Sequence, residues 1–371
     1  MRLPILVLPG DGVGPEVTAE AVAVLERVAA VFGHRLEPER GLVGGEAIDA
    51  EGVPLPEATA RAAEEAPATL LGAVGLPRFD HLPPDRRPER GLLDLRRRLG
   101  VFANLRPSRA WPALVDASPL KNAVVEGTDL LIVRELTSGL YYGTPRGVEG
   151  TGGGERGVNT MAYTRDEIER VARVAFDLAR GRRRQVTSVD KANVLETSQL
   201  WRRVVAGVAA DYPDVALRHM FVDNCAMQLA LAPRQFDVVL TENLFGDILS
   251  DEAAVVAGSI GMLASASLGA PIGTAPGGAR VRRGLYEPVH GSAPDLAGRG
   301  VANPLGAIGS AAALLEHSFG LVDEAAAVAR AIDAVVASGR VTADLRPSGP
   351  PATTREVGRA VCGAITEAAA T

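Results

Sequence analysis

The residues best suited to chemistry in this chain include two aspartates four positions apart. In ENLFGDILSDEAA (242–254), a helix would project the carboxylates of Asp247 and Asp251 from one face. Carboxylate oxygens held side by side are typical ligands of Mg²⁺ or Mn²⁺. Acidic residues early in a helix are also favoured by the helix dipole alone, which is the alternative interpretation. Asp223, in FVDN, follows a predicted strand and is a third candidate.

A second candidate for chemistry is a lysine. Lys121 and Lys191 are the only lysines among 39 basic residues. A lysine ammonium can lose its proton in a desolvated site, whereas arginine stays charged. Lys191, in VTSVDKANVL, is therefore a candidate base, although Lys121 is equally rare.

Arginines and a long loop supply candidate anion and nucleotide sites. Arg96 and Arg106 flank an apolar stretch, and Arg134 closes the strand DLLIVREL. Paired guanidiniums bind carboxylates in bidentate fashion, but most arginines of such a chain are solvated. The segment YEPVHGSAPDLAGRGVANP (286–304) has no helical or strand period, and such a loop can bind phosphates and ribose. An unliganded surface loop is the alternative. GDGVGPEV (10–17) indicates a tight turn and is not the dinucleotide fingerprint.

Alternating strands and helices must position these residues, which predicts an α/β fold with a largely parallel sheet. The predicted strands are LPILVLPG, ATLLGAVG, DLLIVREL, RQVTSVD, LRHMFVDN and FDVVLTEN, and the predicted helices are 16–33, 165–180, 196–211, 304–318 and 323–337. Glycine-rich loops are expected at 268–284 and 346–354. The segment 146–164 is either a disordered linker or an extended arm.

Composition excludes several classes of protein. The chain has 371 residues, 47% of them hydrophobic, and a net charge of −6. That length allows two domains, and that charge argues against nucleic-acid or anionic-membrane partners. Two distant cysteines suggest neither a disulfide framework nor a zinc site. With no signal-peptide or membrane-span pattern, we expect a cytoplasmic protein.

Seven stretches together resemble the β-decarboxylating dehydrogenases, and among them the isopropylmalate branch. They occur in that family's order and are GDGVGPEV, LRRRLGVFANLRP, RELTSGLYYGTPRG, DKANVL, VDNCAMQL, TENLFGDILSDEA and EPVHGSAPDLAGRGVANP. The resemblance implies a two-domain fold with a large mixed, mostly parallel sheet flanked by helices, which is not a standard Rossmann fold. A cofactor domain would comprise 1–101 and 258–371. A substrate, metal and dimerisation domain would comprise 102–257, with the arm at about 146–164.

The same resemblance implies NAD-dependent, Mg²⁺- or Mn²⁺-dependent oxidative decarboxylation of 3-isopropylmalate to 4-methyl-2-oxopentanoate. Lys191 would be the base and Tyr141 the acid. The implied substrate residues are Arg96, Arg106, Arg134, Leu92, Leu93, Val194 and Asp223; the metal ligands are Asp223, Asp247 and Asp251; the cofactor residues are Glu89, Asn193, Glu287, His290, Gly291, Ser292, Ala293, Asp295 and Asn303. The protein would be a homodimer whose active sites are shared between subunits.

Substrate choice is expected to depend on the loop RPERGLLDLR (87–96). Its leucines would form an apolar wall that disfavours a charged substituent. Asp295 would repel a 2′-phosphate, which favours NAD⁺ over NADP⁺. Departures from the family pattern at 70–90, 137–139 and 280–283 leave the reaction intact and keep open a paralogue that acts on another 3-alkyl- or 3-arylmalate. A catalytically silent homologue is a separate alternative, which predicts the loss of an acid, the lysine or the tyrosine, and none of these is lost.

Overall fold

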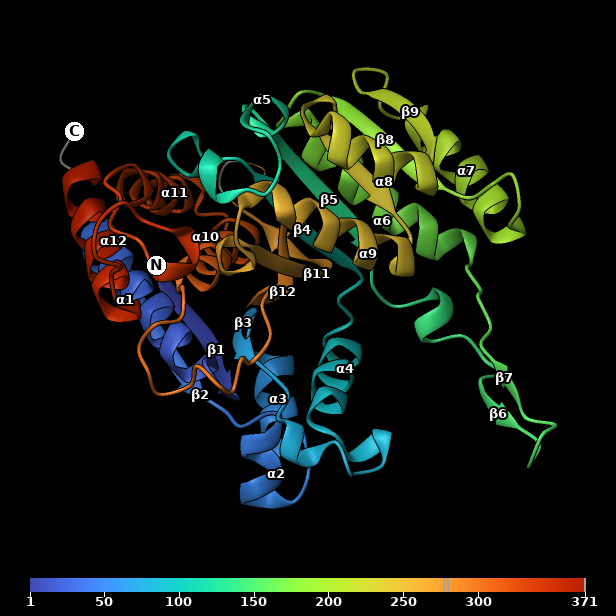
Figure 1. Ribbon diagram of the computed structural model, residues 1–371, viewed down its shortest axis with the longest axis horizontal. Coiled ribbons are helices and arrows are strands. Elements are labelled where there is room, and N and C mark those ends of the chain that lie inside the picture. The colour runs from blue at the N-terminus through green and yellow to red at the C-terminus, as the bar shows by residue number, and fades with distance from the viewer. Residues whose placement is uncertain (276–277, 279, 370–371) are drawn as a thin grey trace. The chain divides into compact units, whose positions relative to one another are not determined.

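The computed structural model describes residues 1–275, 278 and 280–369. The chain divides into two compact units (Figure 1): unit 1 comprises 1–101, 111–119 and 257–371, and unit 2 comprises 102–110 and 120–256. The segment 111–119, which the sequence analysis placed in the second domain, groups with unit 1. No helix in the described part of the chain has the length and apolar character needed to cross a bilayer.

Unit 1 contains five strands of the sheet in the order β2-β1-β3-β12-β11. The pairs β2–β1, β1–β3 and β3–β12 are parallel, whereas β12 and β11 pair antiparallel. The strands are β1 (Arg2–Gly10), β2 (Arg35–Arg40), β3 (Ala68–Ala73), β11 (Ala264–Thr274) and β12 (Arg280–Pro288), and the helices are α1 (Gly14–Phe32), α2 (Gly45–Glu51), α3 (Glu57–Glu65), α4 (Pro88–Leu99), α10 (Leu305–Phe319), α11 (Val322–Ala337) and α12 (Thr354–Ala369).

Unit 2 contributes five further strands in the order β4-β5-β10-β8-β9. All pair in parallel except β4 with β5, so the predicted mixed, mostly parallel sheet is confirmed. The strands are β4 (Ala103–Arg109), β5 (Asp129–Glu135), β8 (Gln185–Asp190), β9 (Ala216–Phe221) and β10 (Val238–Thr241), and the helices are α5 (Asn122–Val125), α6 (Arg165–Arg180), α7 (Glu196–Ala209), α8 (Val222–Leu231) and α9 (Asn243–Ala254).

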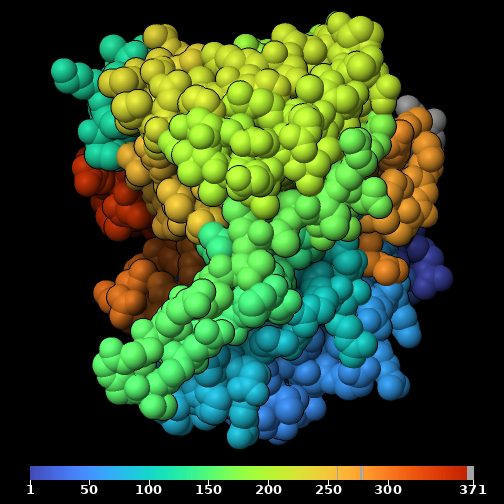
Figure 2. Space-filling model, turned by 90° about the vertical axis from the view of Figure 1, so that its right-hand side faces the viewer, coloured from blue at the N-terminus to red at the C-terminus, as the bar shows by residue number. Residues whose placement is uncertain are grey.

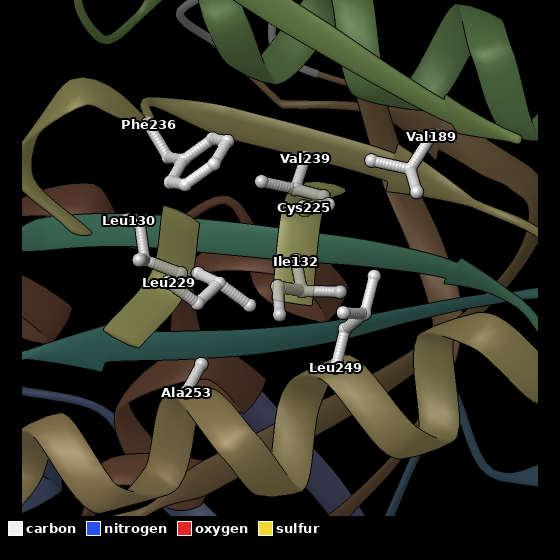
Figure 3. Packing of buried hydrophobic residues seen from close by; sticks show 9 residues of the cluster. All are labelled: Leu130, Ile132, Val189, Cys225, Leu229, Phe236, Val239, Leu249 and Ala253. Atoms are coloured by element: carbon white, nitrogen blue, oxygen red, sulfur yellow. The ribbon is translucent and has the colours of Figure 1, made fainter. Parts of the chain in front are cut away.

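The core of unit 2 fixes one face of its sheet against α8 and α9. Leu130 and Ile132 of β5 pack with Leu249 and Ala253 of α9 in a fully buried cluster (Figure 3). Side chains alternate along a strand. Arg134 therefore projects from the same face of β5 as these two apolar residues, toward α9.

Three sequence predictions of local structure are wrong. The expected loop 87–96 lies in helix α4, where Pro88 occupies the first turn, Leu95 and Leu99 are buried at helical spacing, and Gly100 ends the helix in the left-handed conformation. Most of the expected loop 268–284 belongs to β11 and β12, since glycine composition masked an antiparallel pair. The strand predicted at 217–224 ends at Phe221, where α8 begins.

The segment 146–164 is an extended arm and not a disordered linker. Its strands β6 (Gly147–Glu149) and β7 (Arg156–Val158) pair antiparallel. In Figure 1 they lie away from the sheet of unit 2, and in Figure 2 this green segment lies at the surface. The side chain of Val148 is 73% exposed, so the arm has no core of its own.

Candidate functional site

Five of the predicted site residues of unit 2 lie together beside α9. Arg134 donates from Nη1 to Asp247 Oδ1 at 2.5 Å, and Tyr141 donates its hydroxyl to Asp247 Oδ2 at 2.6 Å. Arg106 donates from Nη1 to Asp251 Oδ1 at 3.2 Å, and its Nη2 lies 3.8 Å from Asp247 Oδ1. The two carboxylates therefore share one group of cations, as their helical spacing predicts.

Strand register explains why the two arginines meet. In the antiparallel β4–β5 pair, Asn104 lies opposite Arg134 and Arg106 lies opposite Ile132. Positions two apart on a strand share a face, so Arg106 and Arg134 project from the same side. Gly246 of α9 is required here, because a Cβ at this position would lie 2.6 Å from Arg134 Cγ.

In this cluster Arg134 is buried, whereas the two carboxylates are accessible to solvent. Arg134 is 4% exposed, whereas the side chains of Asp247 and Asp251 are 34% and 65% exposed. Burial, together with the hydrogen bond to Asp247, raises the pKa of Tyr141 to about 12. The phenol therefore stays protonated at neutral pH and can donate a proton.

Lys191 and Asp223 form a separate pair in unit 2. Lys191 Nζ lies 2.9 Å from Asp223 Oδ2, and this hydrogen bond lowers the pKa of the Asp223 carboxyl. Asp190, at the end of β8, accepts a hydrogen bond from the Ala192 amide at 2.9 Å. Its two carboxylate oxygens also accept from Nε and Nη2 of Arg202. Asp190 thus anchors the turn that carries Lys191, a role that the sequence analysis missed.

The oxygen donors of the two aspartates can be compared with the ligands that a divalent metal ion prefers. Asp247, which is partly exposed, and Asp251, which is exposed, offer carboxylate oxygens, the ligand type that Mg²⁺ and Mn²⁺ prefer. Within the described residues, no three His, Cys, Asp or Glu side chains gather in a group that could hold a metal. The chain therefore brings together two of the three predicted ligands, and the donors of these two fit a divalent cation.

In unit 1, four of the nine predicted cofactor residues, namely His290, Gly291, Ala293 and Asn303, line a pocket of about 250 Å³. It is lined by Val13, Ser259, Ile260, Gly261, His290, Gly291, Ala293, Leu296, Val301, Ala302, Asn303 and Asp344. Burial lowers the pKa of His290, so a neutral imidazole is favoured. Asn303 donates to Asp344 Oδ2 at 3.0 Å. The sequence analysis did not single out Asp344, because VTADLRPSG carries no signal beyond a turn.

The loop that forms this pocket is held by the first turn of the chain. The amide of Val13 donates to Ser292 O at 2.7 Å, and Glu16 of α1 accepts from the Gly300 amide at 3.0 Å. A Cβ at Gly12, whose φ is +60°, would lie 1.9 Å from Ser292 O. GDGVGPEV thus acts as a structural turn, and its glycine permits the close approach of two loops.

Other predicted residues of unit 1 lie along α4. Arg96 donates to Glu287 Oε1 at 2.6 Å in a largely buried ion pair, which joins a predicted substrate residue to a predicted cofactor residue. The carboxylate of Glu89 lies against Gly75, where a Cβ on the glycine would be 2.8 Å from Glu89 Oε1. Leu92 is half-buried and Leu93 is 37% exposed. Arg90, a departure from the family pattern, donates to Asp94 at 2.8 Å along the same helix.

Further predicted residues are also exposed to solvent. Val194 is 61% exposed, and Asn193 lies beside it in the turn after β8. Asp295 is exposed in the loop of unit 1.

Comparisons with known proteins agree with this arrangement. Residues 4–361 match the family model described as isocitrate/isopropylmalate dehydrogenase. The chain is 55% identical over 366 residues to a 3-isopropylmalate dehydrogenase of Halalkalibacterium halodurans, with 98% of each chain covered. It is 57% identical over 349 residues to one from Gloeobacter violaceus, with 94% of each covered. Among solved structures, the isocitrate dehydrogenase of Methylococcus capsulatus matches with a TM-score of 0.82 at 34% identity, covering 98% of this chain and 99% of that one.

Proposed function

Because the chain belongs to the isocitrate/isopropylmalate dehydrogenase family and is a decarboxylating dehydrogenase, we propose that it converts 3-isopropylmalate to 4-methyl-2-oxopentanoate. NAD⁺ would be the oxidant, Mg²⁺ or Mn²⁺ the metal, and leucine biosynthesis the pathway. The observation that carries the proposal is the cluster of Arg106, Arg134, Tyr141, Asp247 and Asp251. In this cluster the arginines would bind substrate carboxylates, the aspartates would bind the metal, and the tyrosine would donate a proton.

In this proposal each residue has one role in the reaction. Arg106 and Arg134 bind the malate carboxylates, and Arg96 supplies a further guanidinium. Lys191 accepts the proton of the 2-hydroxyl as the C2 hydride leaves. When bound, NAD⁺ would supply the acceptor for that hydride, and a divalent cation held by Asp247 and Asp251 would withdraw electron density from substrate oxygens. The bond to the β-carboxylate then breaks, CO₂ leaves, and Tyr141 donates a proton to the carbon of the resulting enolate.

The remaining predicted residues would bind the substituent and the cofactor. Leu92 and Leu93 would face the isopropyl group, together with Val194. Arg90 is paired with Asp94, which supports an apolar rather than a cationic wall. The loop 289–304, with His290, Asp295 and Asn303, would hold the adenosine part of NAD⁺, and Asp344 of the same pocket would join them. Glu89, Asn193 and Glu287 would lie toward the nicotinamide.

We also propose a homodimer in which each active site takes residues from both subunits. Within one chain, Asp223 pairs with Lys191, and Asp247 pairs with the arginines. A second copy would bring the two groups together. The packed helices α8 and α9 expose large apolar side chains, namely Met227 (57%), Leu231 (67%) and Ile248 (58%), which favours a partner there. The exposed arm β6–β7 would add to that contact.

Initial rates of NADH formation test this proposal. Dialysed protein given 3-isopropylmalate, NAD⁺ and Mg²⁺ is expected to form NADH and 4-methyl-2-oxopentanoate in equal amounts. Chelation with EDTA should stop the reaction, and NADP⁺ should support it poorly. Turnover that persists in EDTA would remove the metal from the proposal, and a preference for NADP⁺ would remove Asp295 as its ribose ligand.

A further inference from the structure

Asn243, the first residue of α9, is fully buried and contacts two parts of the arginine cluster at once. Its Oδ1 accepts two hydrogen bonds from Arg134, from Nε at 3.0 Å and from Nη2 at 2.8 Å. Its Nδ2 donates to the carbonyl oxygen of Ser138 at 3.0 Å. Both ends of this amide are therefore used, and each fixes a different segment.

The carbonyl of Ser138 directly precedes the short helix η4 (Gly139–Tyr141), which carries Tyr141. One side chain thus holds the Arg134 guanidinium and the turn that presents the Tyr141 phenol. Asn243 is itself held, because its backbone amide donates to Tyr163 Oη at 3.0 Å, and Tyr163 donates to Glu242 at 2.9 Å.

The acceptor on the Nε and Nη2 side of the buried guanidinium is neutral, whereas Nη1 donates to the Asp247 carboxylate. An amide oxygen orients Arg134 without adding a second negative charge to that of Asp247, whereas a further carboxylate at the same place would compete with an incoming anion. The neighbouring arginine is held in the same way, since Arg106 Nε donates to Oδ1 of the buried Asn104 at 2.9 Å. Two substrate arginines therefore share this use of asparagine.

We propose that Asn243 is a positioning residue for the reaction, which orients the Arg134 guanidinium and the Tyr141 turn together without adding a second negative charge beside the arginine. This inference rests on the proposed function for the identity of the substrate. The residue acts through Arg134 and Tyr141 and needs no contact with the reacting atoms.

A double-mutant cycle tests it. Asn243→Ala is expected to raise the KM for 3-isopropylmalate by at least about tenfold, the cost of losing a buried hydrogen bond to a charged group, and to leave the KM for NAD⁺ unchanged. In an Arg134→Lys background the same change should cost less than about threefold. Ser108→Ala is the matched control, because Ser108 Oγ donates to Ala253 O at 2.6 Å at the other end of α9 and touches no site arginine. Equal loss in both backgrounds would overturn the proposal.

Asn243→Asp keeps the shape of the side chain if the alanine variant fails to fold. It should also raise the KM for 3-isopropylmalate at least about tenfold, since a second carboxylate on Arg134, in addition to Asp247, would compete with the substrate for the guanidinium. An unchanged KM would contradict the proposal.

Hydrogen exchange of the Arg134 side chain, which needs no substrate, tests the role of Asn243 separately from the proposed function. The Arg134 Nε–H signal in NMR spectra, identified by its loss in Arg134→Lys, should exchange slowly with solvent in the parent protein and rapidly in Asn243→Ala. If the parent protein does not turn over 3-isopropylmalate, the proposed function fails, and this exchange still tests Asn243. Slow exchange that persists in Asn243→Ala would overturn the inference.

Discussion

Lys191 is held at the start of the turn that follows β8. Its amide donates to Ser198 Oγ at 3.1 Å, and its ammonium reaches Asp223 at 2.9 Å. These contacts fix both the backbone and the head of the side chain. A base needs such positioning, because proton transfer requires the two heavy atoms to approach within hydrogen-bonding distance.

Lys191→Met is expected to lower kcat by about 10²–10⁴-fold, since general acid–base help is lost. Binding of NADH, followed by fluorescence titration, should change little. The matched control is Lys121→Met, which removes the only other lysine, an exposed residue at the start of α5. Turnover retained in the Lys191 variant would refute its role as base.

Residue types in this site could be predicted from the sequence, but their supporting contacts could not. The spacing of Asp247 and Asp251 indicated a shared face, and the structure places both beside Arg106. Asn243 lies inside the same quoted motif and was not singled out. An asparagine gives no signal of its hydrogen-bond partners, because those come from β5 and from the turn before Tyr141, more than a hundred residues away.

At the scale of elements, the turn after α6 is joined to the sheet of unit 2 by the ion pairs of Arg182. Arg182 donates to the fully buried carboxylate of Asp237 at 2.8 Å and to Asp129 at 2.8 Å. Asp237 precedes β10 and also accepts from the Gln185 amide of β8 at 3.1 Å. This ion pair therefore connects the starts of β5, β8 and β10.

Arg182→Ala should destabilise the protein by about 3 kcal/mol, because it leaves a buried carboxylate without its cation. Urea unfolding followed by circular dichroism measures the loss. The double variant with Asp237→Asn should recover part of it, since the unpaired charge is then removed. A single variant as stable as the parent protein would show that the pair contributes nothing.

His317, in the last turn of α10, makes stability depend on pH. Burial, and secondarily Arg282, lowers the pKa of this imidazole below its ordinary 6.5, while Glu316 acts in the opposite direction. Above pH 6.5 the group is neutral in both states and contributes nothing. As the pH falls below 6.5, the unfolded chain binds a proton that the folded one does not, so folded stability declines.

His317→Gln should therefore lose less stability than the parent protein between pH 7.5 and pH 5.5, as measured by urea midpoints. The comparison must be made at each pH between the two proteins. Other groups also titrate, since burial lowers the pKa of His219 and raises that of Glu242. Parallel curves for the two proteins would contradict this account of His317.

Element prediction failed where composition concealed periodicity. The segment 87–96 was expected to be a loop, yet Leu95 and Leu99 bury one face of α4 and Pro88 begins that helix. By contrast, α6 spans Arg165–Arg180, as predicted, and Thr164 and Glu167 form a capping box that sets its start. Helix boundaries were thus predictable where local capping sets them and unpredictable where tertiary burial does.

At the scale of the whole molecule, the proposed sharing of active sites between subunits makes a quantitative prediction. Lys191→Met and Asp247→Asn should each be inactive as homodimers. When the two are unfolded together and refolded at equal concentrations, half of the dimers are mixed, and one of the two sites in each is intact. About one quarter of the parental activity should return. No recovery, with mixed dimers demonstrated by native mass spectrometry, would place Lys191 and Asp247 of one chain in the same site.

The central claim is that this chain oxidises and decarboxylates a malate with an apolar substituent at C3. The most direct test compares kcat/KM for 3-isopropylmalate, isocitrate, malate and an arylmalate under identical NAD⁺ and Mg²⁺ concentrations. The account predicts that 3-isopropylmalate has the highest value and that isocitrate is disfavoured by its desolvated carboxylate. A higher kcat/KM for isocitrate, or for the arylmalate, would contradict it.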